Sequence, residues 1–349
     1  MEEMSETKLF SDLCAIVETT KRKTAVAVNR GIVFMYWHIG HRINTDVLGN
    51  KRAEYGKRIV AELATQLNEH FQTKEFSSRN LHRMMQFAAD FQDVEIVSAL
   101  ATQLTWSHII EILPLKSTVQ KEFYLTMASK EMWGTKTLRA KIDGMLFERT
   151  AISGKPEEFI KKELTELRET NNLTPDLVFK NPYFLDFTGL KGFYSERDLE
   201  DRLVTKIQQF LMELGNGFCF VERQKRIIID GEDYYIDLLF FHRKLRRLIA
   251  VELKLGRFKA AYKGQMELYL RWLDKYERQE NEESPLGLLL CSDGGDEQIE
   301  LLQLDQSGIR VAQYLTEFPS KELLQQHLRH QIESDNDNSA ETDLIGDNK

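Results

Sequence analysis

An acidic and a basic residue alternate within an otherwise apolar stretch in the second half of the chain. The stretch LIAVELKLG alternates like a β-strand and places Glu252 and Lys254 two residues apart. Side chains two apart on a strand point the same way, so this pair shares one face while Val251 and Leu253 take the other. The preceding run DYYIDLLFFH places Asp237 among apolar residues. If the two runs pair as a hairpin, Asp237 and Glu252 come side by side.

Two carboxylates in so apolar a setting need a compensating charge. An ionised acid removed from water is costly unless it is paired or bound to a metal, and two close acids raise each other's pKa. A divalent cation resolves both problems, since Mg²⁺ takes oxygen ligands from one or two carboxylates together with water and substrate phosphate. Lys254 beside such an ion could orient a water, help to deprotonate it, or neutralise charge in the transition state. This set of groups predicts phosphodiester hydrolysis with Mg²⁺ or Mn²⁺.

Two helices that flank the predicted strands add further polar groups. At about 100° per residue, Glu196 and Glu200 fall on the helix face that should meet the sheet, so a third carboxylate can reach the site. We favour Glu200, which lies one turn deeper, and Glu196 stays the alternative. In the helix after the strands, Gln265 and Tyr269 are four residues apart and therefore neighbours, with Lys263 close by. They could contact the phosphate backbone or hold the catalytic lysine.

The order of these groups resembles a known nuclease family. An acidic strand residue, a Glu-x-Lys pair on the next strand, a preceding helix carboxylate and a following Gln-x-x-x-Tyr helix are similar to the PD-(D/E)XK nuclease superfamily, in particular its YhcG-type branch. The likeness is close along FVERQKRIIIDGEDYYIDLLFFHRKLRRLIAVELKLGRFKAAYKGQMELYLRWLD. It extends to the helical half through YWHIGHRI, KRAEYGKRIV, FSSRNLHRMMQFA and LTWSHIIEIL. Together these segments cover the chain from about Leu9 to His330.

The resemblance implies a restriction-endonuclease-like core and Mg²⁺-dependent cleavage of DNA. It implies an active triad of Asp237, Glu252 and Lys254, with Glu200 as the third metal ligand beside the two acids of the triad. The full set of catalytic candidates is Asp237, Glu252, Lys254, Glu200, Gln265 and Tyr269. Ile236 stands before Asp237 where the family pattern has proline, a departure that touches no catalytic group.

The elements that must position these residues follow from changes in periodicity. Ser195 and Asp198 form a capping-box-like helix start, and Asp230-Gly231 marks a hairpin turn. The predicted elements are, in order, a helix at 195–214, strands at 218–229, 234–242 and 248–255, a helix at 259–276, a strand at 286–291, a short helix and a strand at 309–312. This order predicts a mixed sheet flanked by helices.

Changes in composition and periodicity along the chain predict an α+β multidomain protein. Residues 8–148 predict an all-α domain, because apolar residues recur at spacings of three and four with few turn signals. Residues 149–182 are charged and hold three of the six prolines, which predicts a linker with one short helix at 157–168. Residues 183–332 predict the α/β domain with the mixed sheet. Residues 333–349 predict a disordered acidic tail.

The net charge of −8 does not exclude nucleic acid as a partner. The tail from Gln331 holds six acids and one lysine, so most of the negative charge lies there, while basic residues cluster elsewhere. The basic turn from Arg243 to Arg247 is expected beside the predicted site, either as a phosphate contact or as an ordinary solvated turn.

The helix from Ser78 to Phe91 follows another helix after a short turn. It resembles the second helix of a helix-turn-helix motif, whose first residues face bases or phosphates. A helical bundle that uses the same charged face for protein contacts fits the pattern equally well. The candidates for nucleic-acid contacts are Arg79, Asn80, Arg83, Arg223, Arg243 and Lys263.

Several other classes of protein are disfavoured. Cys14, Cys219 and Cys291 are widely spaced and never form a CxxC pair, which predicts buried thiols rather than disulfides or a zinc site. No apolar run approaches the roughly 20 residues that a membrane span needs, and the first residues lack a signal-peptide pattern. We therefore expect a cytoplasmic protein without a membrane partner.

Two functional hypotheses from different classes follow. The first is a Mg²⁺-dependent deoxyribonuclease, in which a metal-activated water attacks phosphorus and Lys254 assists, with RNA as a more distant substrate option. Its N-terminal domain would recognise DNA, a protein partner or a second copy of the chain. The second is a DNA- or protein-binding component without activity. There, Glu252 and Lys254 would form an ion pair on a solvated edge strand, and Asp237 would be a buried acid satisfied by backbone amides.

Overall fold

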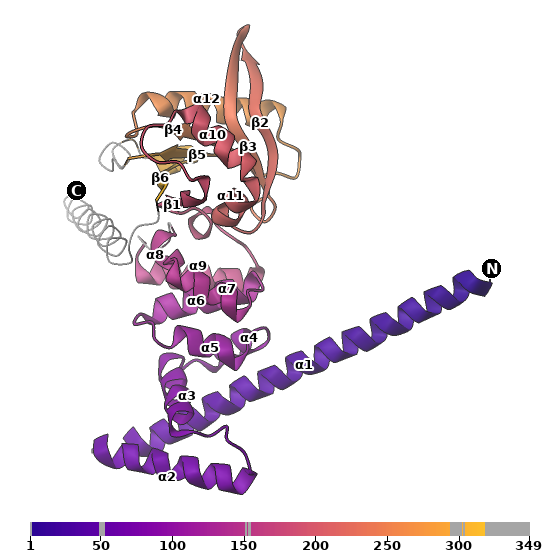
Figure 1. Cartoon of the computed structure of the whole chain (residues 1–349), viewed down its shortest axis with the longest axis vertical. Helices are drawn as coiled ribbons and strands as arrows, with labels where there is room; N and C mark the ends of the chain where they lie inside the picture. Colours follow the sequence, from indigo (N-terminus) through magenta and orange to yellow (C-terminus); the bar gives the residue numbers. More distant parts are fainter. Residues whose placement is uncertain are drawn as a thin grey trace, which may run out of the picture. The chain divides into compact units, whose positions relative to one another are not determined.

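The computed structural model describes residues 2–48, 53–150, 152, 155–293, 302 and 304–317. These residues fall into two compact units, both drawn in Figure 1. The first holds the residues up to Gly144 together with Leu164–Thr170, and the second holds Met145–Glu163 and the residues from Asn171 onward. The predicted acidic tail at 333–349 lies outside the described residues.

Within the described ranges, no helix combines the length and the apolar character that a bilayer crossing requires.

The first unit is helical, as predicted. Its helices are α1 (Glu2–Leu48), α2 (Ala53–Phe71), α3 (Ser78–Asp90), α4 (Val94–Ala101), α5 (Trp106–Ile112), α6 (Thr118–Lys130) and α7 (Thr135–Asp143). Side-chain caps start three of them: Ser77, Asp93 and Ser117 each accept a hydrogen bond from a backbone N–H of the first turn. Such caps satisfy amide groups that the helix itself leaves without partners.

The second half of α1 packs closely on α3. Tyr36, Leu81 and Met84 lie in one buried cluster between the two helices. A Cβ atom on Gly40 would lie 1.9 Å from the carbonyl oxygen of Met84, so the two backbones approach each other at a point where only glycine fits.

The segment predicted as a linker is folded in its described residues. It contains α9 (Glu157–Thr170), on which Ile160, Leu164 and Leu167 are buried at spacings of three and four. The charged residues that favoured a linker therefore belong to the outer face of an amphipathic helix. The segment also contains α8 (Leu146–Arg149) in part, η2 (Pro175–Leu177) and an isolated β-bridge between Thr150 and Lys180.

The second unit is built on a mixed sheet, as predicted. The described strands are ordered β1-β6-β5-β4-β3-β2, with β2, β3 and β4 antiparallel and β4, β5, β6 and β1 parallel. Its elements after β1 (Tyr183–Phe184) are η3 (Asp186–Thr188), α10 (Glu196–Thr205), α11 (Ile207–Leu214), β2 (Phe218–Ile229), β3 (Glu232–His242), β4 (Arg247–Lys254), α12 (Ala261–Tyr276), β5 (Leu286–Cys291), η4 (Leu304–Ser307) and β6 (Ile309–Leu315).

Helices cover both faces of this sheet. Leu199 and Phe210, from α10 and α11, share a core with Val251 and Leu253 of β4. The other face of β4 packs with α12 through residues such as Ala250. Because strand side chains alternate, Glu252 and Lys254 lie on the α12 face.

Two predictions about local structure are wrong in detail. The single helix predicted at 195–214 is two helices, α10 and α11, because the backbone of Lys206 leaves helical geometry at φ −107° and ψ 32°. All three cysteines are free thiols, but only Cys291 is buried, whereas Cys219 is exposed on β2 and Cys14 is half-buried on α1.

Candidate active site

The strand register brings Asp237 and Glu252 together. Strands β3 and β4 pair from His242↔Arg247 to Leu238↔Val251, and Asp237 and Glu252 are the next residues along each strand. The backbone N–H of Asp237 donates to Oε1 of Glu252 over 3.2 Å. In return, the backbone N–H of Leu253 donates to Oδ2 of Asp237 over 2.9 Å. Each carboxylate is thus held by an amide of the neighbouring strand.

Lys254 completes a compact group on the same strand face. Its Nζ lies 3.0 Å from Oε2 of Glu252, and the Lys254 side chain is mostly buried. Strand β4 lies between β3 and β5, so the alternative of a solvated edge-strand ion pair is wrong. Glu252 is only 2% exposed, which leaves little water to solvate its charge.

Burial and neighbouring charges shift the pKa values of all three groups. Burial, with the Asp237 charge beside it, raises the pKa of Glu252 to about 7. Burial likewise raises the pKa of Asp237. Burial alone would lower the pKa of Lys254, but the Glu252 carboxylate outweighs it, so that the pKa rises and the ammonium form is favoured. One cation therefore faces two carboxylates, the buried one of Glu252 and the half-buried one of Asp237.

The two predicted acids of helix α10, Glu196 and Glu200, both contact residues of the sheet or its strand ends, but at different positions. Glu200 is buried and accepts a hydrogen bond of 2.5 Å from Nε of Arg223. Glu196 accepts the backbone N–H of Leu255 over 2.9 Å, at the end of β4. Glu200 is linked to Asp237 through one intervening side chain, Gln224.

Gln224 bridges the strand acid and the helix acid. Its Nε2 donates to Oε2 of Glu200 over 2.8 Å and to Oδ1 of Asp237 over 3.1 Å. The backbone of Gln224 has a φ of +49°, which is rare for a residue other than glycine and is often found at functional sites. We did not predict this residue. Counting outward from the Asp230-Gly231 turn would have found it, because the hairpin register places Gln224 opposite Asp237.

Gln265 and Tyr269 pair with each other on α12. The amide of Gln265 donates to the hydroxyl oxygen of Tyr269 over 2.6 Å, and that hydroxyl donates to the carbonyl oxygen of Tyr235 over 3.2 Å. Tyr269 is buried and joins α12 to β3 two residues before Asp237. These contacts position β3, and a direct catalytic role for either residue remains a prediction.

The basic residues of the sheet unit that we predicted to contact nucleic acid differ in their surroundings. Arg223 is engaged by Glu200 and Asp201. The Nζ of Lys263 donates to the carbonyl oxygen of Leu302 over 3.2 Å. The basic turn with Arg243 lies at the opposite end of β3 and β4 from the carboxylates, and Arg243 is about 20 Å from Asp237 at 3.3 Å per strand residue. It is therefore not beside the site, because the whole paired length of the two strands intervenes.

The predicted contacts of the helical unit lie at the start of α3. Arg79 is exposed and Arg83 is half-buried. The Asn80 side chain is engaged internally: it donates to the carbonyl oxygen of Glu75 over 2.9 Å and accepts from Nε1 of Trp106 over 3.0 Å. A base contact by Asn80 would require both bonds to break.

The oxygen donors of the site fit a divalent cation whose other ligands are water or substrate oxygens. A buried and a half-buried carboxylate, both with raised pKa values, face a single ammonium group and leave negative charge uncompensated, which a hard cation with oxygen ligands would neutralise. Across the residues that the structure describes, no three His, Cys, Asp or Glu side chains gather into a metal-binding set. Asp237 and Glu252 would thus hold such an ion, with Glu200 acting through Gln224.

Comparison with known proteins covers most of the chain. Residues 12–149 match the family described as DUF1016 N-terminal domain, and residues 176–330 match the YhcG PDDEXK nuclease domain. The chain is 30% identical over 318 residues to "Putative nuclease YhcG" of Escherichia coli (strain K12), a match that covers 82% of this chain and 84% of that protein.

Two solved structures show weaker likeness. The crystal structure of a repair endonuclease from Pyrococcus abyssi is 18% identical, with a TM-score of 0.26, over 37% of this chain and 50% of its own. The structure of EndoMS in apo form is 19% identical, with a TM-score of 0.25, over 38% of this chain and 49% of its own. The chain thus spans about half of each of these two structures.

Proposed function

The chain belongs to the YhcG family, whose C-terminal part is a PDDEXK nuclease domain, and from this premise we propose that it hydrolyses DNA phosphodiester bonds in the presence of Mg²⁺ or Mn²⁺. The observation that carries the proposal is that Asp237 and Glu252 lie side by side, each carboxylate accepting a backbone amide of the neighbouring strand, with the Lys254 ammonium 3.0 Å from Glu252. An isolated buried ion pair would need only one of the two acids.

Each residue has a distinct role in this proposal. A divalent cation, when bound, would polarise phosphate and lower the pKa of a water molecule. Asp237 and Glu252 hold it, and the Leu253 amide fixes the orientation of Asp237. Lys254 neutralises negative charge that develops on the phosphate in the transition state. Glu200 reaches the same centre through Gln224.

We assign recognition of DNA or of a protein partner to the helical unit and the chemistry to the sheet unit. Within the helical unit, Arg79 and Arg83 are the more accessible candidates for phosphate contacts, since the Asn80 amide is engaged on both of its sides. Phosphate contacts of this kind make binding salt-dependent.

The direct test is cleavage of plasmid, linear and branched DNA with and without Mg²⁺. We expect metal-dependent cleavage by the wild-type chain and a loss of about 100-fold or more in Asp237→Asn, since metal-ion stabilisation of the transition state contributes several kcal/mol. Asp233→Asn is the matched control: it removes an exposed acid from the same strand, whose carboxylate pairs with Arg226. The proposal is wrong if all three proteins cleave DNA equally well, or if none of them cleaves it.

Calorimetric titration with Mg²⁺ separates the enzyme from the alternative, in which the nuclease fold is only a scaffold for a DNA- or protein-binding component without activity. The enzyme proposal predicts binding to the wild-type chain and to Asp233→Asn but not to Asp237→Asn. A scaffold would bind DNA in a salt-dependent manner without metal, and Glu252→Gln would not change that binding. A parallel reaction with RNA tests the other substrate class.

A further inference from the structure

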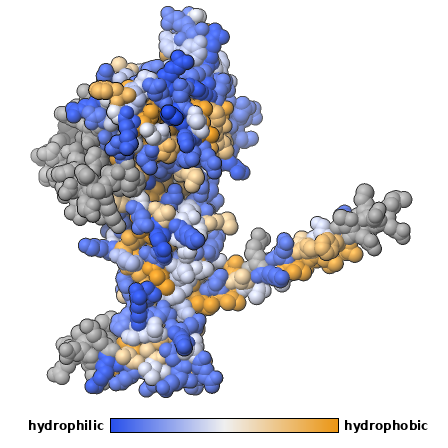
Figure 2. Space-filling view, in the orientation of Figure 1, coloured by the Kyte–Doolittle hydropathy of each residue, from blue (hydrophilic) through white to orange (hydrophobic). Residues whose placement is uncertain are grey.

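One side of α1, from Leu9 to Met35, exposes a long row of large apolar side chains. Their exposed fractions run from 39% for Met35 to 69% for Phe10. The residues are Leu9, Phe10, Leu13, Ile16, Val17, Val28 and Met35. Figure 2 shows hydrophobic residues along this helix, and Figure 1 shows no other helix of the helical unit beside its first half.

These side chains form a straight stripe on one side of the helix. Its centre line runs at spacings of three and four through large apolar residues and then small ones, the spacing at which one face of a helix packs on another helix. These residues are Leu9, Leu13, Ile16, Thr20, Thr24, Ala27 and Gly31. The stripe lies opposite the face that the second half of α1 buries against α3 through Val33, Tyr36 and Gly40. The packing of the helical unit therefore leaves the stripe uncovered.

The two flanks of the stripe differ in character. One flank is apolar and carries Phe10, Val17, Val28 and Met35. The other flank carries the charged residues Asp12, Lys23 and Arg30. This asymmetry constrains the direction in which a second helix can pack.

We propose that the stripe pairs with the same stripe of a second copy of the chain, in antiparallel orientation. In an antiparallel pair with two-fold symmetry, like flanks meet, so apolar side chains cover apolar ones and Asp12 of each copy faces Lys23 of the other. A parallel pair would place the charged flank of one helix against the apolar flank of its partner. Charge and apolar surface are therefore complementary only in the antiparallel arrangement.

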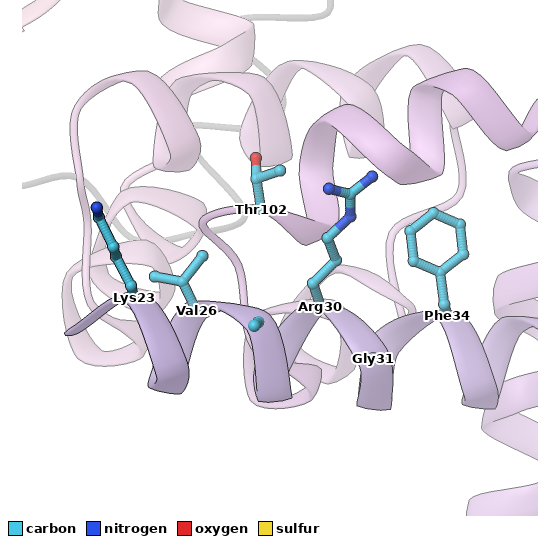
Figure 3. Close-up of a pocket in the computed structure, with 7 residues that line it drawn as sticks. Lys23, Val26, Arg30, Gly31, Phe34 and Thr102 are labelled. Carbon is cyan, nitrogen blue, oxygen red and sulfur yellow. The ribbon is translucent and has the colours of Figure 1, made fainter. Parts of the chain in front are cut away.

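The register and the size of the contact follow from the same residues. Opposing Asp12 and Lys23 places the symmetry axis next to Val17 and sets Leu9 near Ala27. The first turns of the partner then reach a hollow of about 670 Å³ beside Ala27, Gly31 and Thr102, into which Arg30 and Phe34 project (Figure 3). In this register the six large side chains from Leu9 to Val28 of each copy would bury roughly 1,000 Å² of surface, the size at which specific interfaces begin.

The mass of the full-length protein in solution tests the pairing. Light scattering should give twice the 40.8 kDa chain mass for the wild type and the single mass for Leu13→Glu with Ile16→Glu. Both residues are exposed on α1, so the change should leave the helical circular dichroism intact. Met132→Glu is the control, since Met132 is 87% exposed elsewhere in the same unit and should not affect the mass. A monomeric wild type, or a double variant that stays dimeric, overturns the proposal.

Cysteine cross-linking tests the orientation. In a Cys14→Ser, Cys219→Ser background, Val17→Cys should cross-link to itself, because the symmetry axis passes beside it. Leu9→Cys should not cross-link alone but should do so when mixed with Ala27→Cys. Self-cross-linking of Leu9→Cys would indicate a parallel pair and overturn the antiparallel assignment. Neither experiment depends on nuclease activity, so the pairing and the proposed chemistry can fail separately.

Discussion

At the scale of single residues, the site gathers negative charge that the protein's own amide and ammonium groups compensate only in part. Glu252 is buried and Asp237 is half-buried, and both have raised pKa values, although each accepts a hydrogen bond from a backbone amide and Lys254 lies beside them. Charged groups in such surroundings destabilise the folded state until a counter-charge arrives. The stability of the metal-free protein should therefore report on the site.

The first prediction concerns the pH dependence of that stability. The Glu252 carboxyl holds its proton up to about pH 7 when folded, against an ordinary pKa of 4.5. The folded state thus binds more protons between these values, and the free energy of unfolding falls as the pH rises through them, by on the order of 2 kcal/mol. Urea unfolding in EDTA at pH 5 and pH 8 should show this loss in the wild type and not in Glu252→Gln.

Added Mg²⁺ provides the control for this measurement. At pH 8 the ion should restore stability to the wild type, because a ligand that binds only the folded state stabilises it. The same addition should do little for Glu252→Gln. Parallel pH profiles for the two proteins would show that Glu252 does not titrate in this range.

The second prediction concerns Gln224, which touches Asp237 and Glu200 at once. Gln224→Ala should weaken Mg²⁺ binding about 10- to 100-fold, the usual effect of removing a side chain that orients a metal ligand. Calorimetric titration measures this without reference to activity. Gln209→Ala, at an exposed position of α11, is the matched control and should bind as the wild type does. An unchanged affinity in Gln224→Ala would make the bridge a purely structural feature.

At the scale of elements, close backbone approach fixes how the helices pack. Gly40 brings α1 against α3, and Gly287 of β5 lies under Met266 of α12, whose side-chain atoms would lie 2.6 Å from a Cβ at that position. The first contact faces backbone and cannot yield, while the second faces a flexible side chain. The α1–α3 contact is therefore the less tolerant of the two.

The third prediction follows from this difference. Gly40→Ala should destabilise the helical unit by about 2 kcal/mol or more, since its new methyl group overlaps the Met84 carbonyl. Gly264→Ala adds the same methyl group to α12, where nothing lies within 4 Å, and should stabilise by about 0.5 to 1 kcal/mol. Thermal unfolding measures both changes. Equal effects at the two positions would contradict the close approach.

At the scale of the whole molecule, pairing through α1 would give a particle with two copies of the catalytic unit. A duplex has two strands to cut, and two linked sites raise the effective concentration of the second site once the first has engaged. The oligomeric state should therefore affect the product formed rather than the chemistry at each site.

The fourth prediction tests this coupling on supercoiled plasmid. The wild type should convert it to linear DNA with little accumulation of the nicked form. Leu13→Glu with Ile16→Glu should nick at a similar rate per chain and accumulate nicked circles several-fold before linearisation. Gel analysis over time distinguishes the two patterns, with Met132→Glu as the control. Identical time courses would show that the two sites act independently.

Local patterns in the sequence were sufficient to predict much of this molecule. Alternation in β4 placed Glu252 and Lys254 on one face, the Asp230-Gly231 turn placed β2 beside β3, and the strand order predicted the mixed sheet. Each of these inferences depends on side-chain periodicity or on a tight turn, which are properties of a few neighbouring residues.

Only the tertiary structure decided which distant residues meet. It placed Gln224 between two acids, engaged Asn80 with Trp106, and set the Arg243 turn far from the carboxylates. It also broke the helix at Lys206, although apolar spacing continues through the break from Leu203 to Phe210. Such outcomes depend on strand register, backbone conformation and the packing of helices on the sheet, because contacts between residues far apart along the chain are fixed only when the whole unit folds.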